Sequence, residues 1–177
     1  MAFDSPELAP AEKDTFKLVA AIKWCLQRFR EFSTAYLTDY EEGSWTPVLT
    51  FATPGDLAVT YSTQVGRYVK IGRLVLAQFA ITTATFTHTT ASGGLQITGV
   101  PFTSLNVSGV RSRVGCLWQG VTKANYTDMA VTLAENSTTI SIAASGSGQN
   151  AVALAAGDLP NGGGVRFDAA LCYIADE

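Results

Sequence analysis

The chain has 177 residues, of which 47% are hydrophobic and only 15% are charged, and its formal net charge at pH 7 is −3. The length fits one domain with an appendage, and the slightly acidic balance gives no reason to expect nucleic acid or a membrane surface as partner. Because about 25% of the residues of an average globular protein are charged, the shortage of charge predicts that much of the surface is covered, most simply by other copies of the chain.

The first 42 residues form a zone of their own, which carries about half of the charged residues. Ser5 followed by Pro6 is typical of a helix start, with Ser as cap and Pro at the first helical position. From residue 11 to about residue 36, apolar residues recur at steps of three and four, the period of an amphipathic helix. The main positions of this stripe are Val19, Ile22, Leu26 and Phe29. We interpret residues 1–42 as an N-terminal helical segment.

This apolar stripe is broad, because Leu18, Cys25 and Phe32 widen it by one column. It is wider than the seam of a two-stranded coiled coil and must be buried against something. It could pack on the β-domain of its own chain. We favour the alternative, in which the segment joins copies of the chain around a symmetry axis or docks into a larger assembly. The pattern is too short to count the chains.

Residues 43–177 read as short strands bounded by Gly and Pro. Residues 37–43 are expected to be a solvated connector, residues 54–56 a turn, and Gly72 a tight reversal. We predict strands beginning near Trp45 and over residues 57–62, 65–71, 73–83, 95–98, 111–121, 130–133, 139–143 and 165–173. Eight to ten such strands predict a mainly β fold, an antiparallel β-sandwich or jelly-roll-like domain preceded by the N-terminal α-helix.

Two features of these strands carry further expectations. Both faces of the strand over residues 73–83 are largely apolar, so we expect it to be covered on both sides. Arg67, Lys70 and Arg73 would form a basic strip along one hairpin, which is either solvated or paired with acidic residues of a neighbouring subunit.

The order of three segments resembles a known kind of domain. They are G-S-W-T-P-V-L-T-F over residues 43–51, Y-S-T-Q-V-G-R-Y-V-K-I-G over residues 61–72 and I-T-G-V-P-F over residues 97–102. Together they resemble the small β-domains at the ends of bacteriophage tail fibres and of other phage fibre or spike proteins. The segments include no catalytic signature, so the resemblance concerns fold and setting.

The resemblance implies a phage virion protein, made in the host cytoplasm, that mediates attachment to the host cell surface as part of a tail fibre or spike. Phage fibres are commonly trimers, so it also implies a homo-oligomer of three copies, bound to other virion proteins through its N-terminal segment. The alternative is a capsid or collar fibre, or a decoration protein, with a purely structural role.

The sequence offers no set of catalytic or metal-binding residues. His88 is the only histidine, and no cysteine lies near it, so a zinc site is not expected. The carboxylates are scattered over turns and do not suggest the pair that glycosidases need. Cys25, Cys116 and Cys172 are far apart and are expected to be free thiols. We therefore predict no cofactor and no enzyme, with a glycan-degrading enzyme as the less favoured alternative.

Candidate ligand-binding residues lie in three polar loops, over residues 85–94, 123–128 and 145–150. Their rings and amides would suit the hydroxyl groups of a host surface glycan. The candidates are Phe86, His88, Asn125 and Tyr126, with Trp118 added from a strand. Each also has a plain structural reading, in which Trp118 belongs to the core, as Trp45 does, and His88 is an exposed loop residue without a ligand.

Overall fold

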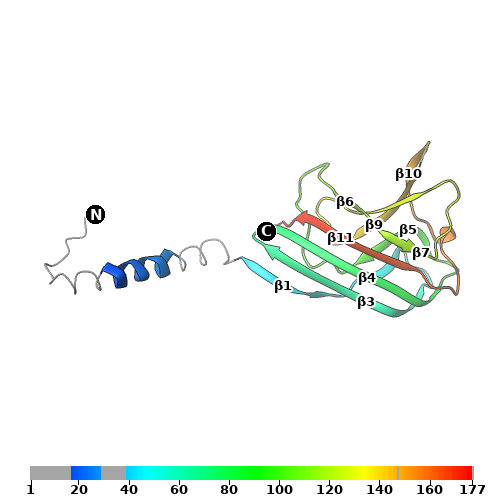
Figure 1. Cartoon of the computed structure of the whole chain (residues 1–177). Helices are drawn as coiled ribbons and strands as arrows, with labels where there is room; N and C mark the ends of the chain where they lie inside the picture. Colours follow the sequence, from blue (N-terminus) through cyan, green and yellow to red (C-terminus); the bar gives the residue numbers. More distant parts are fainter. Residues whose placement is uncertain (1–16, 29–38, 147, 177) are drawn as a thin grey trace. The chain divides into compact units, whose positions relative to one another are not determined.

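The computed structural model describes residues 17–28 and 39–176, apart from residue 147. The chain divides into two compact units, residues 1–40 and residues 41–177, and we call the second the β-unit. Residues 17–28 form a helix (Figure 1). The remainder of the predicted helix, including Phe29, lies outside the described residues. No described helix combines the length and apolar character that crossing a membrane requires.

The described helix presents the predicted apolar stripe to solvent. Val19, Ile22 and Leu26 are 44%, 51% and 61% exposed. Away from this stripe, the guanidinium carbon of Arg28 lies 5.6 Å from the ring centroid of Trp24, a cation–π contact between residues one helical turn apart. Within the described helix itself, nothing covers the stripe.

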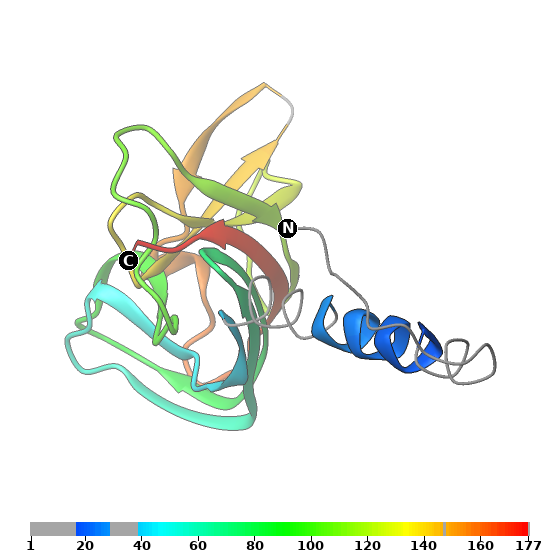
Figure 2. The same ribbon diagram turned by 90° about the vertical axis from the view of Figure 1, so that its left-hand side faces the viewer.

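The β-unit consists of two antiparallel sheets (Figure 1). The first has the order β1-β3-β4-β11-β7, with β1 (Tyr40–Trp45), β3 (Ala58–Ile71), β4 (Leu74–Thr87), β11 (Arg166–Ile174) and β7 (Leu117–Gln119). The second has the order β2-β5-β9-β8-β6, with β2 (Val48–Thr53), β5 (Ser92–Thr98), β9 (Ile140–Gly146), β8 (Asp128–Leu133) and β6 (Ser112–Gly115). Strand β10 (Gln149–Ala153) pairs with β9, and the resulting hairpin projects from the sheet (Figure 2). A 3-10 helix, η1 (Ala156–Asp158), precedes β11.

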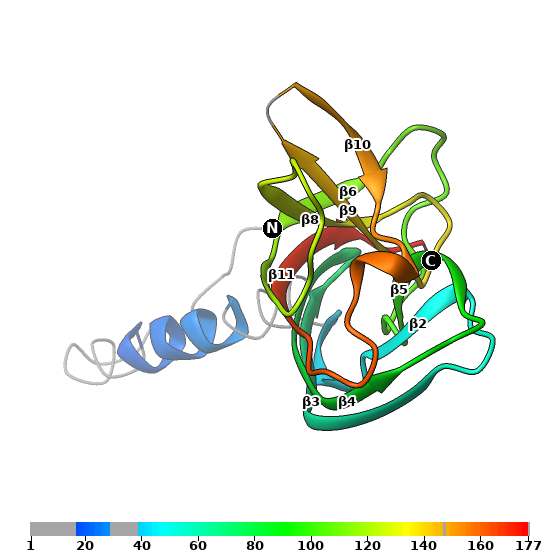
Figure 3. The ribbon, with the colours of Figure 1, turned by 90° about the vertical axis from the view of Figure 1, so that its right-hand side faces the viewer.

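The core lies between these sheets, which Figure 3 shows as separate layers. Ile81 and Phe167 enter it from the five-stranded sheet, and Ile97, Val131 and Ile142 enter it from the other, each fully buried. Alternation along each strand puts every second side chain on this inner face. The prediction of a mainly antiparallel, two-sheet β fold preceded by a helix is confirmed.

The first of the three sequence segments owes its pattern to Trp45. This indole is 8% exposed and meets the ring of Phe79 edge-on, with the centroids 6.0 Å apart. Its Nε1 donates to the carbonyl of Gln78 at 3.2 Å. The indole lies across Gly66, where a Cβ would come within 2.6 Å of the ring. The tryptophan of the W-x-P pattern and the glycine of the Q-x-G pattern therefore pack directly against each other. The interpretation of Trp45 as a core residue is confirmed.

Pro47 marks the corner where the chain passes from β1 in one sheet to β2 in the other. Two side chains of β3 secure this corner. Gln64 Nε2 donates to the carbonyl of Pro47 at 3.0 Å, and the hydroxyl of Tyr61 accepts from the N–H of Leu49 at 2.9 Å. The tyrosine and glutamine of the Y-x-x-Q pattern thus hold the start of β2.

Several strand boundaries differ from those expected. Residues 40–43 belong to β1 rather than to a connector. The two strands predicted over 57–62 and 65–71 are one strand, β3, which begins at Ala58. Irregular pairing around Tyr61 lets β3 continue through the polar residues between the two predicted strands. The strand predicted over 111–121 is wrong, because the chain leaves β6 in one sheet at Cys116 and enters β7 in the other.

The outer face of the five-stranded sheet is open, which corrects the expectation that β4 is covered on both sides. Val75 is fully buried, whereas its neighbours Leu74 and Leu76 are 47% and 42% exposed. The prediction that Arg67, Lys70 and Arg73 form one basic strip is also wrong. Lys70 Nζ lies 5.5 Å from the ring centroid of Phe102, Arg73 Nε donates to a backbone carbonyl at 3.0 Å, and Arg67 stays on the outer face.

The carboxylate of Asp56 fastens the loop that joins β4 to β5. It accepts the backbone N–H groups of Thr89 at 2.8 Å and of Thr90 at 2.7 Å, together with both of their hydroxyls. The hydroxyl of Thr89, followed by the two backbone N–H groups, lowers the pKa of Asp56 below its ordinary value. Because the folded-state pKa is lowered, this contribution to stability is complete above the unfolded-state value of about 3.9 and is lost as the pH falls toward the folded-state pKa.

We expect Asp56→Ala to accelerate amide hydrogen exchange at Thr89 and Thr90 at neutral pH, since both amides lose their acceptor. As the pH falls from ~4 toward the folded-state pKa of Asp56, the protection factors of the same two amides, which correct for slower intrinsic exchange in acid, should decline. Asp128→Ala is the matched control, because Asp128 accepts from the hydroxyl of its neighbour Thr127. Unchanged protection in Asp56→Ala would show that the loop is held by other contacts.

Candidate binding site on the five-stranded sheet

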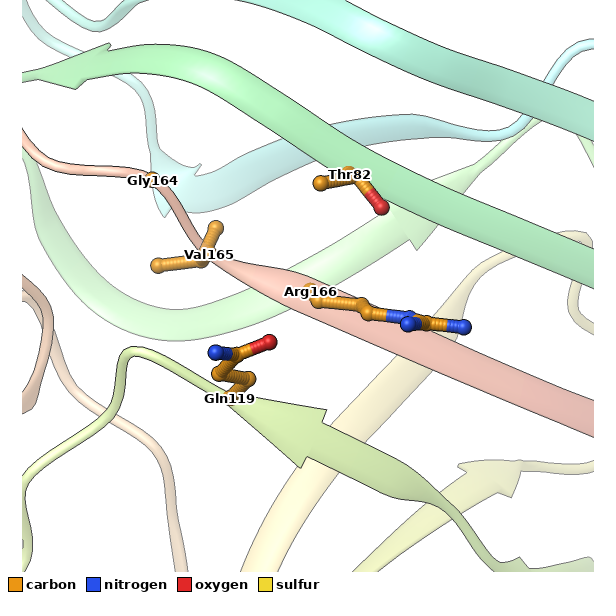
Figure 4. Close-up of a pocket in the computed structure, with 5 residues that line it drawn as sticks. All are labelled: Thr82, Gln119, Gly164, Val165 and Arg166. Carbon is orange, nitrogen blue, oxygen red and sulfur yellow. The ribbon is translucent and has the colours of Figure 1, made fainter.

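One cross-strand row on the outer face of the five-stranded sheet brings three polar side chains together. Thr82 of β4 pairs with Arg166 of β11, which in turn pairs with Gln119 of β7. With Gly164 and Val165 these residues line a hollow of about 200 Å³, which we call the polar hollow. Figure 4 shows Thr82 and Gln119 on opposite sides of the β11 segment that carries Arg166.

The floor of the polar hollow is fixed by close backbone approaches. Thr83 and Val165 exchange hydrogen bonds, with the N–H of Thr83 donating to the Val165 carbonyl at 2.9 Å and the N–H of Val165 donating to the Thr83 hydroxyl at 2.9 Å. Gly120 follows β7 with φ +79°, and a Cβ there would lie 2.2 Å from the carbonyl oxygen of Gly164. Only glycine combines that backbone conformation with that approach.

Polar groups in and beside the hollow retain unused hydrogen-bonding capacity. Arg166 donates from Nε and Nη2 to one carboxylate oxygen of Asp168, at 2.9 and 2.5 Å, and these bonds raise the pKa of Arg166. The other oxygen, Oδ1 of Asp168, is buried and accepts no hydrogen bond among the described residues. The side chains of Gln119 and Thr82 make no hydrogen bond within the described part of the chain.

A second hollow, of about 170 Å³, lies on the same face between β3 and β4. It is lined by Val65, Arg67, Gln78, Phe79 and Ala80. Like the polar hollow, it combines one arginine with one glutamine. The second hollow adjoins the polar hollow, because Ala80, which lines it, pairs with Asp168 in the row next to that of Thr82 and Arg166. Asp168 in turn pairs with Leu117, whose side chain is 57% exposed.

This arrangement suits a ligand with many hydroxyl groups. Each hydroxyl both donates and accepts, and the glutamine amides, the Thr82 hydroxyl and the arginines offer partners of both kinds. Leu117 adds an apolar surface beside them. In the part of the chain that is described, no three His, Cys, Asp or Glu side chains lie close enough together to hold a metal ion.

Phe86 does not fit the role expected from the sequence. It is fully buried and meets the ring of Phe51 edge-on, with the centroids 5.9 Å apart. The cause is an irregularity in the β3–β4 pairing, where Tyr61 pairs with Thr83 but Thr60 pairs with Thr85, which leaves Ala84 as an extra residue. This bulge shifts the alternation by one position and turns Phe86 inward.

His88 is part of the same aromatic cluster rather than an exposed loop residue. Its ring centroid lies 5.5 Å from those of Phe51 and Phe86, and its Nε2 is buried without a hydrogen-bond partner among the described residues. Its backbone N–H donates to Oδ1 of Asn161 at 3.1 Å. The exposed-loop interpretation is therefore wrong, and the ring contributes to packing.

The other predicted ligand residues occupy mixed environments. Asn125 is exposed, with φ 66°. Tyr126 is half-buried against the core, with Lys123 Nζ 5.4 Å from its ring centroid and 2.6 Å from a carboxylate oxygen of Asp158. Trp118 is half-buried on the inner face of β7, opposite Phe167. Of these rings and amides, the Asn125 amide is the most accessible to a ligand.

Two of the three predicted loops meet. The N–H of Thr127 donates to the carbonyl of Ser145 at 3.1 Å, and a Cβ on Gly146 would lie 3.0 Å from the carbonyl oxygen of Asn125. The loop around His88 instead contacts Asn161. Ligand binding by these loops remains a prediction.

The sequence reasoning missed the polar hollow, although its members leave a trace in the strand patterns. Thr82 and Gln78 fall on the outward positions of β4, and Arg166 and Asp168 fall on those of β11. Polar residues at alternate positions indicate an open sheet face. That signal pointed to the correct face but could not show that residues 82, 119 and 166 share one row.

No protein-family model and no curated protein sequence matches this chain. Among solved structures, the chain is similar to the crystal structure of the Dettilon tailspike protein, with a TM-score of 0.55 and 17% sequence identity. The match covers 76% of this chain and 24% of the tailspike chain. At this identity the similarity is one of fold, and this chain corresponds to a limited part of the tailspike.

Proposed function

We propose that the chain is a virion component of a bacteriophage tail, a fibre or spike protein that contributes to attachment to the host cell surface. The observation that carries this proposal is the similarity of fold to a tailspike protein. The first two of the three segments that resemble phage fibre domains support it, because their residues form the corner between the two sheets. In this proposal the protein is made in the host cytoplasm and is assembled into the virion.

The proposed ligand is a saccharide of the host surface, bound in the polar hollow. Sugar hydroxyls match the unused groups of Thr82 and Gln119 and the fixed guanidinium of Arg166. The exposed Leu117 next to the hollow would cover an apolar patch of a sugar ring. The lining of the polar hollow includes no carboxylate, whereas glycoside hydrolysis uses two. We accordingly propose binding without catalysis.

Combining Thr82→Val with Gln119→Ala should weaken saccharide binding by roughly tenfold, since each lost hydrogen bond contributes about 0.5–1.5 kcal/mol. The melting temperature should stay unchanged, because neither side chain makes a hydrogen bond within the described part of the chain. The measurement is binding to an array of bacterial surface polysaccharides. Gln149→Ala is the matched control, an exposed glutamine on β10 of the other sheet.

Two results would contradict this assignment. If Gln149→Ala or Asn125→Ala weakens binding while the double variant binds normally, the ligand occupies the loops instead. Tyr126→Ala is not a clean probe of those loops, because its half-buried ring packs on the core and under Lys123. Release of reducing sugar from a bound polysaccharide would overturn the proposal of binding without catalysis.

A structural role without a receptor is the second candidate, as a collar or capsid fibre or as a decoration protein. The observation that favours it is the open apolar part of the five-stranded sheet, which suits contact with protein more than contact with sugar. Immuno-electron microscopy of the virion distinguishes the two. Labelling at the tail tip supports attachment, and labelling over the capsid or collar, combined with no binding on the array, supports the structural role.

The proposal includes assembly into a homo-oligomer, with three copies as the resemblance to phage fibres implies. The exposed stripe of Val19, Ile22 and Leu26 would form the helical contact, and the N-terminal segment would also join the protein to other virion proteins. Helices with a broad apolar face are stable only when that face is buried.

A further inference from the structure

Two neighbouring rows on the outer face of the five-stranded sheet are entirely apolar apart from one thiol. In the first row Ile71, Leu74 and Ile174 pair across β3, β4 and β11, and in the second Val69, Leu76 and Cys172 do so. We call these six residues the apolar rows. Ile71, Leu74, Leu76 and Ile174 are 48%, 47%, 42% and 40% exposed, and Cys172 is exposed as well.

The apolar rows are unusual for a surface. An antiparallel sheet with one solvated face normally carries polar side chains on that face. A contiguous group of large exposed aliphatic side chains instead indicates a protein contact. The inner neighbours Val75 and Tyr173 are buried, so the core gains nothing from the aliphatic residues on the outside.

The charges around the apolar rows define which partner fits. None of the six residues is charged, and Arg73 at the adjacent turn is paired with Asp176, with 3.8 Å between nitrogen and oxygen. Farther along the face, Arg166 is paired with Asp168. The row next to the apolar rows carries the exposed Arg67 opposite Gln78, so the charge on this face lies beside the apolar rows and not within them. The apolar rows therefore gain nothing from a strongly charged partner, and copies of them can meet around a symmetry axis with little charge repulsion when their Arg67 side chains point apart.

We propose that the apolar rows pack against a second copy of this chain. The inference rests on the oligomeric assembly included in the proposed function and adds a second contact to it. Once helices join the copies, their β-units are held at high effective concentration, so a modest apolar face is sufficient for association. The rows with the two hollows lie beside the contact, and the sheet thus divides into an assembly half and a ligand half.

Cys172 provides a direct probe, since it lies in the second apolar row beside Leu76. Alkylation requires access to the thiol. Cys25 widens the helical stripe and would be covered by the helical contact, so labelling of the chain unfolded in denaturant reports that the reagent is active. Burial raises the pKa of Cys116 to about 11, so this thiol should react more slowly than an exposed one. Labelling of the full chain with a maleimide, followed by peptide mass spectrometry, reads the cysteines separately.

The test compares the unaltered chain with a Leu76→Gln and Ile174→Gln double variant, which is neutral and leaves the charge near Cys172 unchanged. Val48→Gln with Val152→Gln is the matched control, two valines 39% and 36% exposed on strands of the other sheet. We expect the unaltered chain and the control to assemble as a multiple of 18.7 kDa. Their Cys172 should react roughly tenfold more slowly than in the Leu76–Ile174 variant.

Two outcomes overturn the inference. In the first, the protein assembles but Cys172 reacts as fast as in the Leu76–Ile174 variant, so the copies meet elsewhere and the proposed assembly survives. In the second, the unaltered chain is a single copy of 18.7 kDa, whatever the reactivity of Cys172, and the assembly included in the proposed function fails too. A third variant, Ile22→Asp with Leu26→Asp, removes the helical contact. If this variant still assembles and Cys172 is still protected, the sheet contact holds the copies together without the helices.

Discussion

Gly66→Ala is expected to destabilise the β-unit by about 3 kcal/mol, at the upper end of the range for overpacked cores. The new Cβ would come within 2.6 Å of the Trp45 indole, which is buried and cannot move aside without losing its contact with Phe79 and its hydrogen bond to the Gln78 carbonyl. For a unit of this size, that loss corresponds to a fall of roughly 10 °C in melting temperature. Chemical and thermal unfolding measure both quantities.

Gly115→Ala is the matched control for this substitution. Gly115 is also a strand glycine, in β6, but no atom lies within 4 Å of its added Cβ and its φ is not positive. Replacing such a glycine should be neutral or should stabilise the protein by up to about 1 kcal/mol, because alanine restricts the unfolded chain. Equal effects at the two positions would show that Trp45 has room to shift and that the Q-x-G pattern has another cause.

Phe86→Ala is expected to cost about 3–5 kcal/mol of stability, the range for a buried phenylalanine. The substitution removes a fully buried ring and its edge-on contacts with Phe51 and His88, whose centroids lie 5.9 and 5.5 Å away. Denaturant unfolding measures the loss. Saccharide binding per folded molecule should be unaltered, since the ring is closed to solvent.

Phe102→Ala serves as the comparison, because Phe102 is half-buried and packs against Tyr68 and Lys70 at the edge of the core. Phe102→Ala should lower the stability by less than half as much as Phe86→Ala, because the half-buried ring of Phe102 removes less apolar area from water on folding. If Phe86→Ala instead leaves stability intact and abolishes binding, Phe86 has the ligand role first expected from the sequence.

Local chemistry in the sequence determined the class of the fold and several of its turns. Gly and Pro between β-branched and aromatic runs predicted antiparallel strands, and Gly72 predicted the reversal that joins β3 to β4, where Ile71 pairs with Leu74. The helical period predicted the helix that includes residues 17–28. These features depend on residues close together in the chain, so a single sequence is sufficient to find them.

The tertiary structure alone decided which faces are open and which distant residues meet. The bulge at Ala84 reversed the direction expected for Phe86, and the crossing at Cys116 divided one predicted strand between two sheets. The row of Thr82, Arg166 and Gln119 exists only because β4, β11 and β7 pair in a particular register. The apolar rows depend in the same way on the register of β3, β4 and β11. Alternation in a strand defines two faces, but cross-strand register and the packing of the second sheet determine which face is buried and what lies beside each residue.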